Sequence, residues 1–427
     1  MKKKTNWYRL DNSGMIYPLV ITEKTQSLYR IGAKLAEDVN PNFLRVAVNT
    51  ALERYPYFRV ELKKGLFRHY LDENTRAPLI EEDDGVLLKI LNFRKNRYFL
   101  FRVTYFGKRI FMDFFHGVTD ANGAMEFLKT ILYYYFKTAN DPIPRDNVLT
   151  LSSPERPEET EDAFRRYYTK TSFKKGLQKM ASGFAFQVRG RQFDYEGFGL
   201  VQGTVDTQKL LDRAHFYHCS LTEYLSALAL LSVAKAHGES KQQEDFIAFI
   251  PVNLRKKFPS GTMLNFTNFA KCTVPRHCGL RLEAFISFIK SALSEQLSEE
   301  ELRLKISFTS LMDSSKILRY TPLALKSFFS RVGREFSAKT KQTMIISNLG
   351  RVNLDAGDRI DHFLFNLNVS ERTPLNFAVV SYGNKTALSF TRKVIGTEVE
   401  KEFFRALAKE VGEVEIISNF REENDVL

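Results

Sequence analysis

Between residues 109 and 136 the spacing of apolar side chains changes from that of a strand to that of a helix. Residues 110–115 are apolar at almost every position, which predicts a strand buried on one or both faces. Farther on, Met125, Leu128, Leu132 and Tyr135 recur at steps of three and four residues, so they form one face of a helix over residues 121–136. The polar turn between them, residues 116–120, therefore leaves a buried strand and enters a helix.

The rest of the chain alternates between the same two patterns. Before residue 136 the patterns predict a helix over 43–54, strands over 15–21, 27–35 and 58–62, and a hairpin of 98–105 with 109–115. After residue 198 they predict strands over 199–205, 245–252, 344–350, 364–368, 376–382 and 387–391. Helices are predicted over 206–214, 221–236, 282–297, 321–336 and 398–411, with a polar segment, 297–308, between two of them. This alternation predicts an α/β protein.

The segment 138–165 differs from its surroundings, because it is rich in proline and carries an acidic run. We interpret it as an exposed crossover between two parts of the chain. The predicted division is an N-terminal subdomain, residues 1–165, and a C-terminal subdomain, residues 166–427, with the boundary somewhere between 140 and 200.

Composition restricts the setting of the protein. The 427 residues are 44% hydrophobic, enough for two domains that bury about three quarters of their unfolded surface. No apolar run reaches the length of a membrane span, and the lysines near residue 1 precede no apolar segment, so we expect neither a transmembrane segment nor a signal peptide. Three scattered cysteines suit a reducing compartment, and we expect a cytoplasmic protein.

The net charge of +13 raises the question of a nucleic-acid partner. The basic residues are dispersed and no nucleic-acid motif accompanies them, so we expect no such partner. A basic balance also steers anionic substrates, but a solvated basic surface explains the net charge better.

His116 is the strongest candidate for chemistry. It ends the predicted strand, so its backbone is held while its imidazole can face a cavity and accept a proton near neutral pH. Gly117 permits an unusual turn and a close approach by another group. Asp120 can either orient the imidazole or pair with a cation. The alternative for His116 is a core histidine that only bonds to backbone.

These residues, Phe-His-Gly-Val-Thr-Asp at 115–120 followed by Gly-Ala-Met-Glu-Phe-Leu at 123–128, resemble the His-x-x-x-Asp motif of the chloramphenicol acetyltransferase-like superfamily. Bacterial alcohol-acetyltransferase-like proteins are the most similar members. Pro-Val-Asn-Leu-Arg at 251–255, followed by Asn-Phe at 265–266, resembles a second signature of the superfamily, and Ser347-Asn348 resembles a turn near its acyl channel. The resemblance implies two similar subdomains, each a mixed β-sheet flanked by helices, with an active-site channel between them.

The resemblance also implies a reaction. His116 would be the general base that moves an acyl group from acyl-CoA to a small alcohol or amine, Asp120 would hold the turn, and Arg255 would pair with Asp120. Gly117, Ser347 and Asn348 would be candidates for oxyanion stabilisation and the channel. No metal or redox cofactor is implied, coenzyme A enters as a co-substrate, and a monomer is expected.

Two alternatives remain within this resemblance. The donor could be bound to an acyl carrier protein, as in condensation domains, although Phe115 replaces the first histidine of their motif and Ala121 replaces their glycine. The protein could also be a catalytically silent relative that binds a lipid, a metabolite or a protein partner.

Other motifs in the sequence provide weaker evidence of function. His215, His218, Cys219 and Glu223 could be imagined as a metal cluster, but a polar turn before a capped helix explains them better. The chain has no Gly-x-Ser-x-Gly elbow and no phosphate-binding glycine loop, so a covalent acyl-enzyme route lacks its residues.

Overall fold

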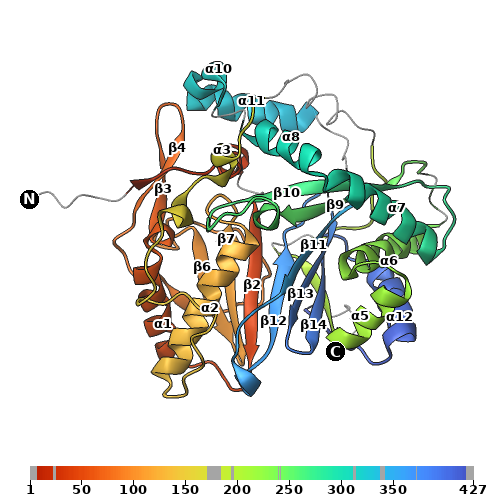
Figure 1. The fold of residues 1–427 in the computed structure, drawn as a ribbon, viewed down its shortest axis with the longest axis horizontal. Coiled ribbons are helices and arrows are strands. Elements are labelled where there is room, and N and C mark those ends of the chain that lie inside the picture. Colours follow the sequence, from red (N-terminus) through yellow and green to blue (C-terminus); the bar gives the residue numbers. More distant parts are fainter. Residues whose placement is uncertain are drawn as a thin grey trace, which may run out of the picture.

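In the computed structural model, two mixed β-sheets stand side by side and helices cover them (Figure 1). The structure describes residues 7–22, 26–170, 184–193, 197–238, 240, 242–310, 314–336, 342–371 and 373–419. Among these residues, no helix has the length and apolar character that crossing a membrane requires.

The first sheet has the order β12-β2-β7-β6-β5, and only β5 and β6 pair in parallel. Its strands are Ile360–Leu367, Leu28–Leu35, Arg109–Phe115, Phe101–Phe106 and Ile80–Glu82. Helices α1 (Pro41–Arg54) and α2 (Ala121–Thr138) pack on each other and on this sheet (Figure 1). The core between them holds Ile31, Val48, Phe114 and Phe127.

The second sheet has the order β10-β9-β11-β13-β14-β8-β15, with β11 parallel to both of its neighbours. In this order its strands are Thr267–Val274, Phe246–Asn253, Met344–Arg351, Leu375–Tyr382, Lys385–Arg392, Gly199–Asp206 and Glu415–Ser418. The helices beside it are α5 (Thr207–Phe216), α6 (Leu221–Ala236), α7 (Leu282–Gln296) and α12 (Glu398–Val411) (Figure 1).

Smaller elements complete the molecule. A third sheet has the order β1-β4-β3, with strands Trp7–Tyr8, His69–Glu73 and Val60–Lys64. The remaining α-helices are α3 (Ala163–Arg166), α8 (Glu299–Thr309), α10 (Lys316–Tyr320) and α11 (Leu323–Phe336). Single 3₁₀ turns are η1 (Tyr17–Val20), η2 (Pro56–Phe58), η3 (Pro157–Thr160), η4 (Leu254–Lys256) and η5 (Gly357–Arg359).

The predicted fold class, two subdomains that each contain a mixed sheet flanked by helices, is confirmed. The division at residue 165 stays a prediction, and part of the boundary region, 171–183, lies outside the described residues. The division is crossed at β12, which follows β11 in sequence yet pairs with β2 of the first sheet, Phe365 lying opposite Ile31.

Two sequence predictions were wrong. Residues 15–21, predicted as a strand, contain the 3₁₀ turn η1 with Pro18 in its first turn. The polar segment 297–308 is largely the helix α8, which Ser298 caps by accepting a hydrogen bond from the Glu301 backbone N–H. The helix has a mostly polar surface, but its apolar side chains Leu302 and Ile306 are buried against α3 and the residues after β9.

We predict that Gly203→Ala destabilises the second subdomain, because a Cβ at this position in β8 would lie 2.3 Å from the Phe404 ring of α12. The expected loss is about 1–3 kcal/mol in the free energy of unfolding, measured by urea denaturation. Gly190→Ala is the control, since its Cβ would meet no atom closer than 3.6 Å. Equal stability of the two variants would contradict the prediction.

Candidate functional site

A cavity of about 1120 Å³ is lined by residues of both large sheets. His116 and Tyr29 reach it from the first sheet, and Ile250 and Ser347 reach it from the second. The cavity therefore depends on how the two halves of the chain pack together.

His116 follows directly after β7, where the strand leaves the sheet. Its backbone N–H donates to the carbonyl oxygen of Ser27, 2.9 Å away, which extends the pairing between β7 and β2 by one residue. Gly117 does not adopt a positive φ. A Cβ there would meet the Phe115 ring at 2.5 Å, so the turn requires glycine for close packing.

The imidazole of His116 is held on several sides. Tyr17 stacks on the ring, with the ring centroids 4.5 Å apart, and Tyr29 meets it edge-on at 5.1 Å. Nδ1 lies 2.9 Å from Oδ1 of Asn265. Burial lowers the pKa of His116, and this effect exceeds the opposing influence of Asp120 and the hydrogen bond to Asn265. The ring is therefore neutral at pH 7.

Asn265 is fixed in turn by Asp11, whose Oδ2 accepts from the Asn265 side-chain amide at 2.9 Å and from its backbone N–H at 3.2 Å. Because the amide N–H₂ of Asn265 points at the Asp11 carboxyl group, its oxygen faces His116 and accepts a hydrogen bond from Nδ1–H. This arrangement selects the tautomer that leaves Nε2 without a proton. Burial, with Asp162 nearby, raises the pKa of Asp11 to about 7.

Asp120 caps α2 and lies beside the imidazole without bonding to it. Its two oxygens accept hydrogen bonds from Gly123 N–H, Phe266 N–H, the Thr267 hydroxyl and the guanidinium of Arg255. Burial would raise the pKa of Asp120, but the charge and hydrogen bonds of Arg255 and these donors hold it below its usual value. Of the two roles open from sequence, Asp120 pairs with a cation, while Asn265 contacts the imidazole.

Arg255 lies in η4, directly after β9, and its Nη1 is 2.8 Å from Asp120 Oδ2. The same guanidinium donates to the carbonyl oxygens of Thr262 and Leu264 and to the Asn253 side chain. All of these partners are in the second half of the chain except Asp120. The ion pair that the resemblance implied therefore connects α2 to the segment after β9.

The three candidates for oxyanion stabilisation differ in position. Ser347 and Asn348, on β11, line the cavity, whereas Gly117 is not among its lining residues. The Asn348 amide is engaged on both atoms, since its nitrogen donates to the Thr222 hydroxyl and its oxygen accepts from Gly350 N–H. Within the described residues the Ser347 hydroxyl makes no hydrogen bond, so it is available to a ligand.

Sequence reasoning missed three residues of this site. Asn265 was noticed only as part of a motif, and no role was assigned to it. Asp11 and Tyr17 come from the N-terminal segment, where nothing in the local pattern marks them as partners of His116. Their signal is three-dimensional, because 254 residues separate Asp11 from Asn265.

The imagined metal cluster does not form: no group of three or more His, Cys, Asp or Glu residues suited to a metal occurs in the described part of the chain. Ser220 and Glu223 form a reciprocal capping box at the start of α6. Cys219 is buried beneath this turn.

Comparisons with solved structures agree with this architecture. Polyketide synthase associated protein 5 from Mycobacterium tuberculosis matches with a TM-score of 0.63 and 12% identity, over 95% of this chain and 97% of that chain. TRI3 trichothecene 15-O-acetyltransferase from Fusarium sporotrichioides gives 0.60 and 10%, over 96% and 95%. A variant of the starter condensation domain of rhizomide synthetase RzmA, in complex with C8-CoA and Leu-SNAC, gives 0.58 and 11%, over 95% of each chain.

No protein-family model matches the chain, and no curated protein is similar to it in sequence. At these identities the structural likeness establishes the fold, which is the two-subdomain chloramphenicol acetyltransferase-like fold shared by acetyltransferases and condensation domains.

We predict that Arg255→Leu lowers the free energy of unfolding by about 3–5 kcal/mol at pH 7, because it leaves the buried Asp120 carboxylate without its cation. The low pKa of Asp120 stabilises the native protein above the unfolded pKa of about 3.9, and this stabilisation is lost as the pH falls toward the native value. The difference between variant and wild type should therefore shrink in acid.

Urea denaturation at several pH values measures this effect. Arg281→Ala is the control, because its 3.8 Å contact with Glu283 is well exposed and should contribute less than about 1 kcal/mol. A loss at Arg255 no larger than the loss at Arg281 would show that the ion pair does not hold the site together.

Proposed function

We propose that the protein is an acyltransferase that moves an acyl group from an acyl-CoA thioester to an alcohol or amine, with His116 as the general base. The observation that carries this proposal is the placement of His116 on the cavity with Nδ1 bound to Asn265. The other ring nitrogen, Nε2, is thereby left to act on a substrate. The shared fold of an acetyltransferase and condensation domains supports the same class of reaction.

The reaction proceeds by direct transfer. Nε2 of His116 removes the proton from the acceptor hydroxyl or amine as its oxygen or nitrogen attacks the thioester carbonyl carbon. The tetrahedral intermediate then collapses, the carbon–sulfur bond breaks, and the imidazolium returns the proton to the departing thiolate. The Tyr17 stack and the Asn265 hydrogen bond hold the ring in one orientation during both proton transfers.

Ser347 is the proposed donor to the oxyanion. Its hydroxyl lines the same cavity as His116 and is not engaged by another described residue, in contrast to the amide of Asn348. A free hydroxyl on the cavity wall can donate a hydrogen bond to the oxyanion and stabilise its developing negative charge.

Coenzyme A is the proposed carrier of the acyl group. Lys256, Lys290 and Arg351 line the cavity and would attract its phosphates. The RzmA condensation domain, which has the same fold, was crystallised with C8-CoA, and this supports a CoA donor here. In this proposal the chemistry requires no metal or redox cofactor. The alternative is an acyl donor bound to an acyl carrier protein, and the assay described below distinguishes it from acyl-CoA.

The test follows thiol release from acetyl-, butyryl- and palmitoyl-CoA in the presence of a panel of alcohols and amines. We predict release that requires an acceptor and falls by about 10²–10⁴-fold in His116→Ala. His215→Ala is the matched control, since His215 is exposed on α5 and does not line the cavity. Release that persists in His116→Ala would contradict the role of His116 as the base. Release seen only with acylated carrier protein would establish the carrier-bound donor, and none with either donor would favour a silent binder.

The pH dependence of kcat/KM tests the protonation state of His116. Because burial lowers the pKa of the imidazole, the ring is neutral at pH 7, and we expect kcat/KM to fall only once the pH drops below about 6.5. A profile whose acid limb lies above pH 7.5 and persists when Asp11 is replaced by asparagine would contradict this assignment.

A further inference from the structure

The segments β1, the β3–β4 turn, α10 and α11 lie at one end of the molecule (Figure 1). This end carries most of the strongly exposed apolar side chains. Eight large hydrophobic side chains in the described residues are at least 55% exposed, and six of them lie here. These six, which we call the apolar patch, are Trp7, Leu66, Ile317, Tyr320, Phe328 and Phe329. A cluster of exposed apolar side chains of this kind indicates a binding surface.

Helix α11 is oriented with its apolar stripe outward. Leu325, Phe328 and Phe329 stand three and four residues apart, so they share one face, and all three are exposed. The face toward the protein carries Leu323, which is buried, together with Lys326, which is half-buried. A helix that contributes only to a protein core would place its aromatic stripe inward.

The patch is held in a defined shape by contacts between its segments. The backbone N–H of Leu323 donates to the carbonyl oxygen of Leu66 at 2.8 Å, and Lys326 Nζ donates to that of Phe67 at 2.8 Å. The Phe67 and Tyr320 rings meet edge-on at 6.1 Å. The turn and the two helices therefore present one continuous surface.

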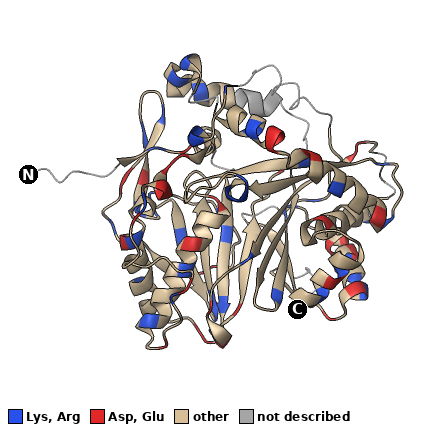
Figure 2. Cartoon of the chain, viewed as in Figure 1, with Lys and Arg blue, Asp and Glu red and all other residues tan. Residues whose placement is uncertain are grey.

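Basic residues predominate in the segments that form the patch, and the one acidic residue in the sequence of α11 is Glu335, near its end. Residues 7–10, 64–71 and 314–330 contain no Asp or Glu. They contain six basic residues: Arg9, Lys64, Arg68, Lys316, Arg319 and Lys326. Figure 2 shows the same contrast with other helices such as α12, where both signs of charge are mixed.

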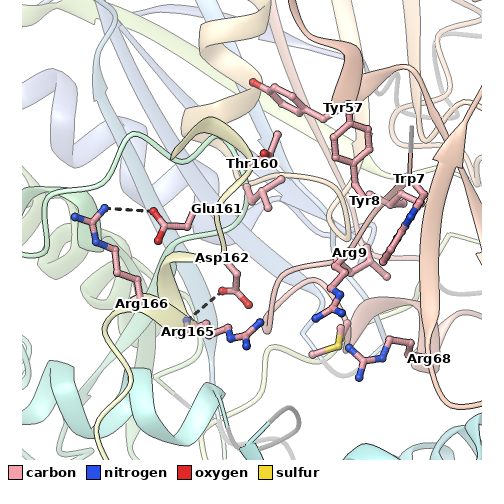
Figure 3. Close-up of a pocket in the computed structure, with 14 residues that line it drawn as sticks. Trp7, Tyr8, Arg9, Tyr57, Arg68, Thr160, Glu161, Asp162, Arg165 and Arg166 are labelled. Carbon is pink, nitrogen blue, oxygen red and sulfur yellow. Dashed lines mark hydrogen bonds and ion pairs between the residues drawn. The ribbon is translucent and has the colours of Figure 1, made fainter. Parts of the chain in front are cut away.

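Two cavities open beside the patch and share Trp7, Arg9 and Arg68 among their linings. Their volumes are about 620 and 320 Å³. Arg9, Arg68 and Arg165, from three segments of the chain, all line the larger cavity (Figure 3).

The two carboxylates of the larger cavity are engaged by other groups. Glu161 pairs with Arg166 at 3.2 Å, and Asp162 caps α3 and accepts from the Asn12 side chain at 2.7 Å. An anion of tetrahedral or carboxylate geometry, such as a lipid phosphate, would complement the three guanidinium groups.

We propose that this end of the molecule is a docking surface for an anionic lipid bilayer. Aromatic and aliphatic side chains of the apolar patch enter the interfacial region, and Lys64, Lys316 and Arg319 contact anionic headgroups. The cavity lined by Arg9, Arg68 and Arg165 receives a headgroup phosphate. A second copy of this chain is a poorer occupant, because a symmetric contact would oppose two strongly basic surfaces. The inference is independent of the proposed acyl transfer.

The experiment is co-sedimentation of the full chain with vesicles of phosphatidylcholine alone and of phosphatidylcholine with phosphatidylglycerol. We expect binding to the anionic vesicles only, with an affinity that falls as salt is added. The double variant Phe328→Ser, Phe329→Ser should bind at least about tenfold more weakly, since it removes two apolar side chains from the interface. The double variant Arg9→Glu, Arg319→Glu should reduce binding by a comparable or larger factor.

Matched controls carry double changes of the same kind at other exposed sites: Phe106→Ser with Phe216→Ser, and Lys401→Glu with Arg405→Glu on α12. Both should bind as the wild type does, and circular dichroism checks that every variant is folded. The proposal is overturned if the wild type stays in the supernatant with both vesicles, or if the patch variants and controls bind equally. It also fails if soluble glycerol phosphate occupies the arginine cavity while vesicles do not bind, or if the patch variants merely dissociate a dimer seen by ultracentrifugation.

Discussion

The ion pair between Asp120 and Arg255 is the interaction on which the architecture of the site depends. A buried carboxylate is costly unless its lone pairs are satisfied, and Asp120 meets this requirement with donors from α2, η4 and the start of β10. The same carboxylate caps α2, so the beginning of that helix and the segment after β9 have one fixed relative position. Because His116 lies only four residues before Asp120, fixing Asp120 also fixes the position of His116. The ion pair therefore affects the proposed base indirectly, by fixing the position of the segments around it.

Three distant parts of the chain then share the control of one imidazole. The first sheet supplies His116, the segment after Arg255 supplies Asn265, and the N-terminal segment supplies Asp11 and Tyr17. This division separates two roles that the sequence offered as alternatives for Asp120. Asp120 fixes the turn, and Asn265 fixes the tautomer. The two carboxyl groups differ in pKa: burial raises the pKa of Asp11, whereas the paired arginine holds the pKa of Asp120 below its usual value.

Local patterns predicted most of the fold, and they did so where one periodicity dominates. The change of spacing from β7 to α2 located His116, and the capping-box spacing located α6. Prediction was wrong where a short apolar run contained proline, as at Pro18, and where a polar helix buried only two apolar side chains, as in α8. Contacts such as Asp11 with Asn265 could not be predicted, because no local rule relates residues so far apart. The helical spacing in α11 was visible from sequence, but which face met solvent was not.

The pairing of β12 with β2 has a consequence for how the protein is made. During synthesis β2 emerges early and β12 emerges more than 300 residues later, so the first sheet lacks one edge strand for most of translation. An apolar strand with unpaired backbone groups can pair with strands of other chains. Because the loop between β2 and β12 is long, the sheet is completed slowly. The N-terminal half is therefore the aggregation-prone part of the nascent chain. A chain that is truncated before residue 360 would have a first sheet that still lacks a strand.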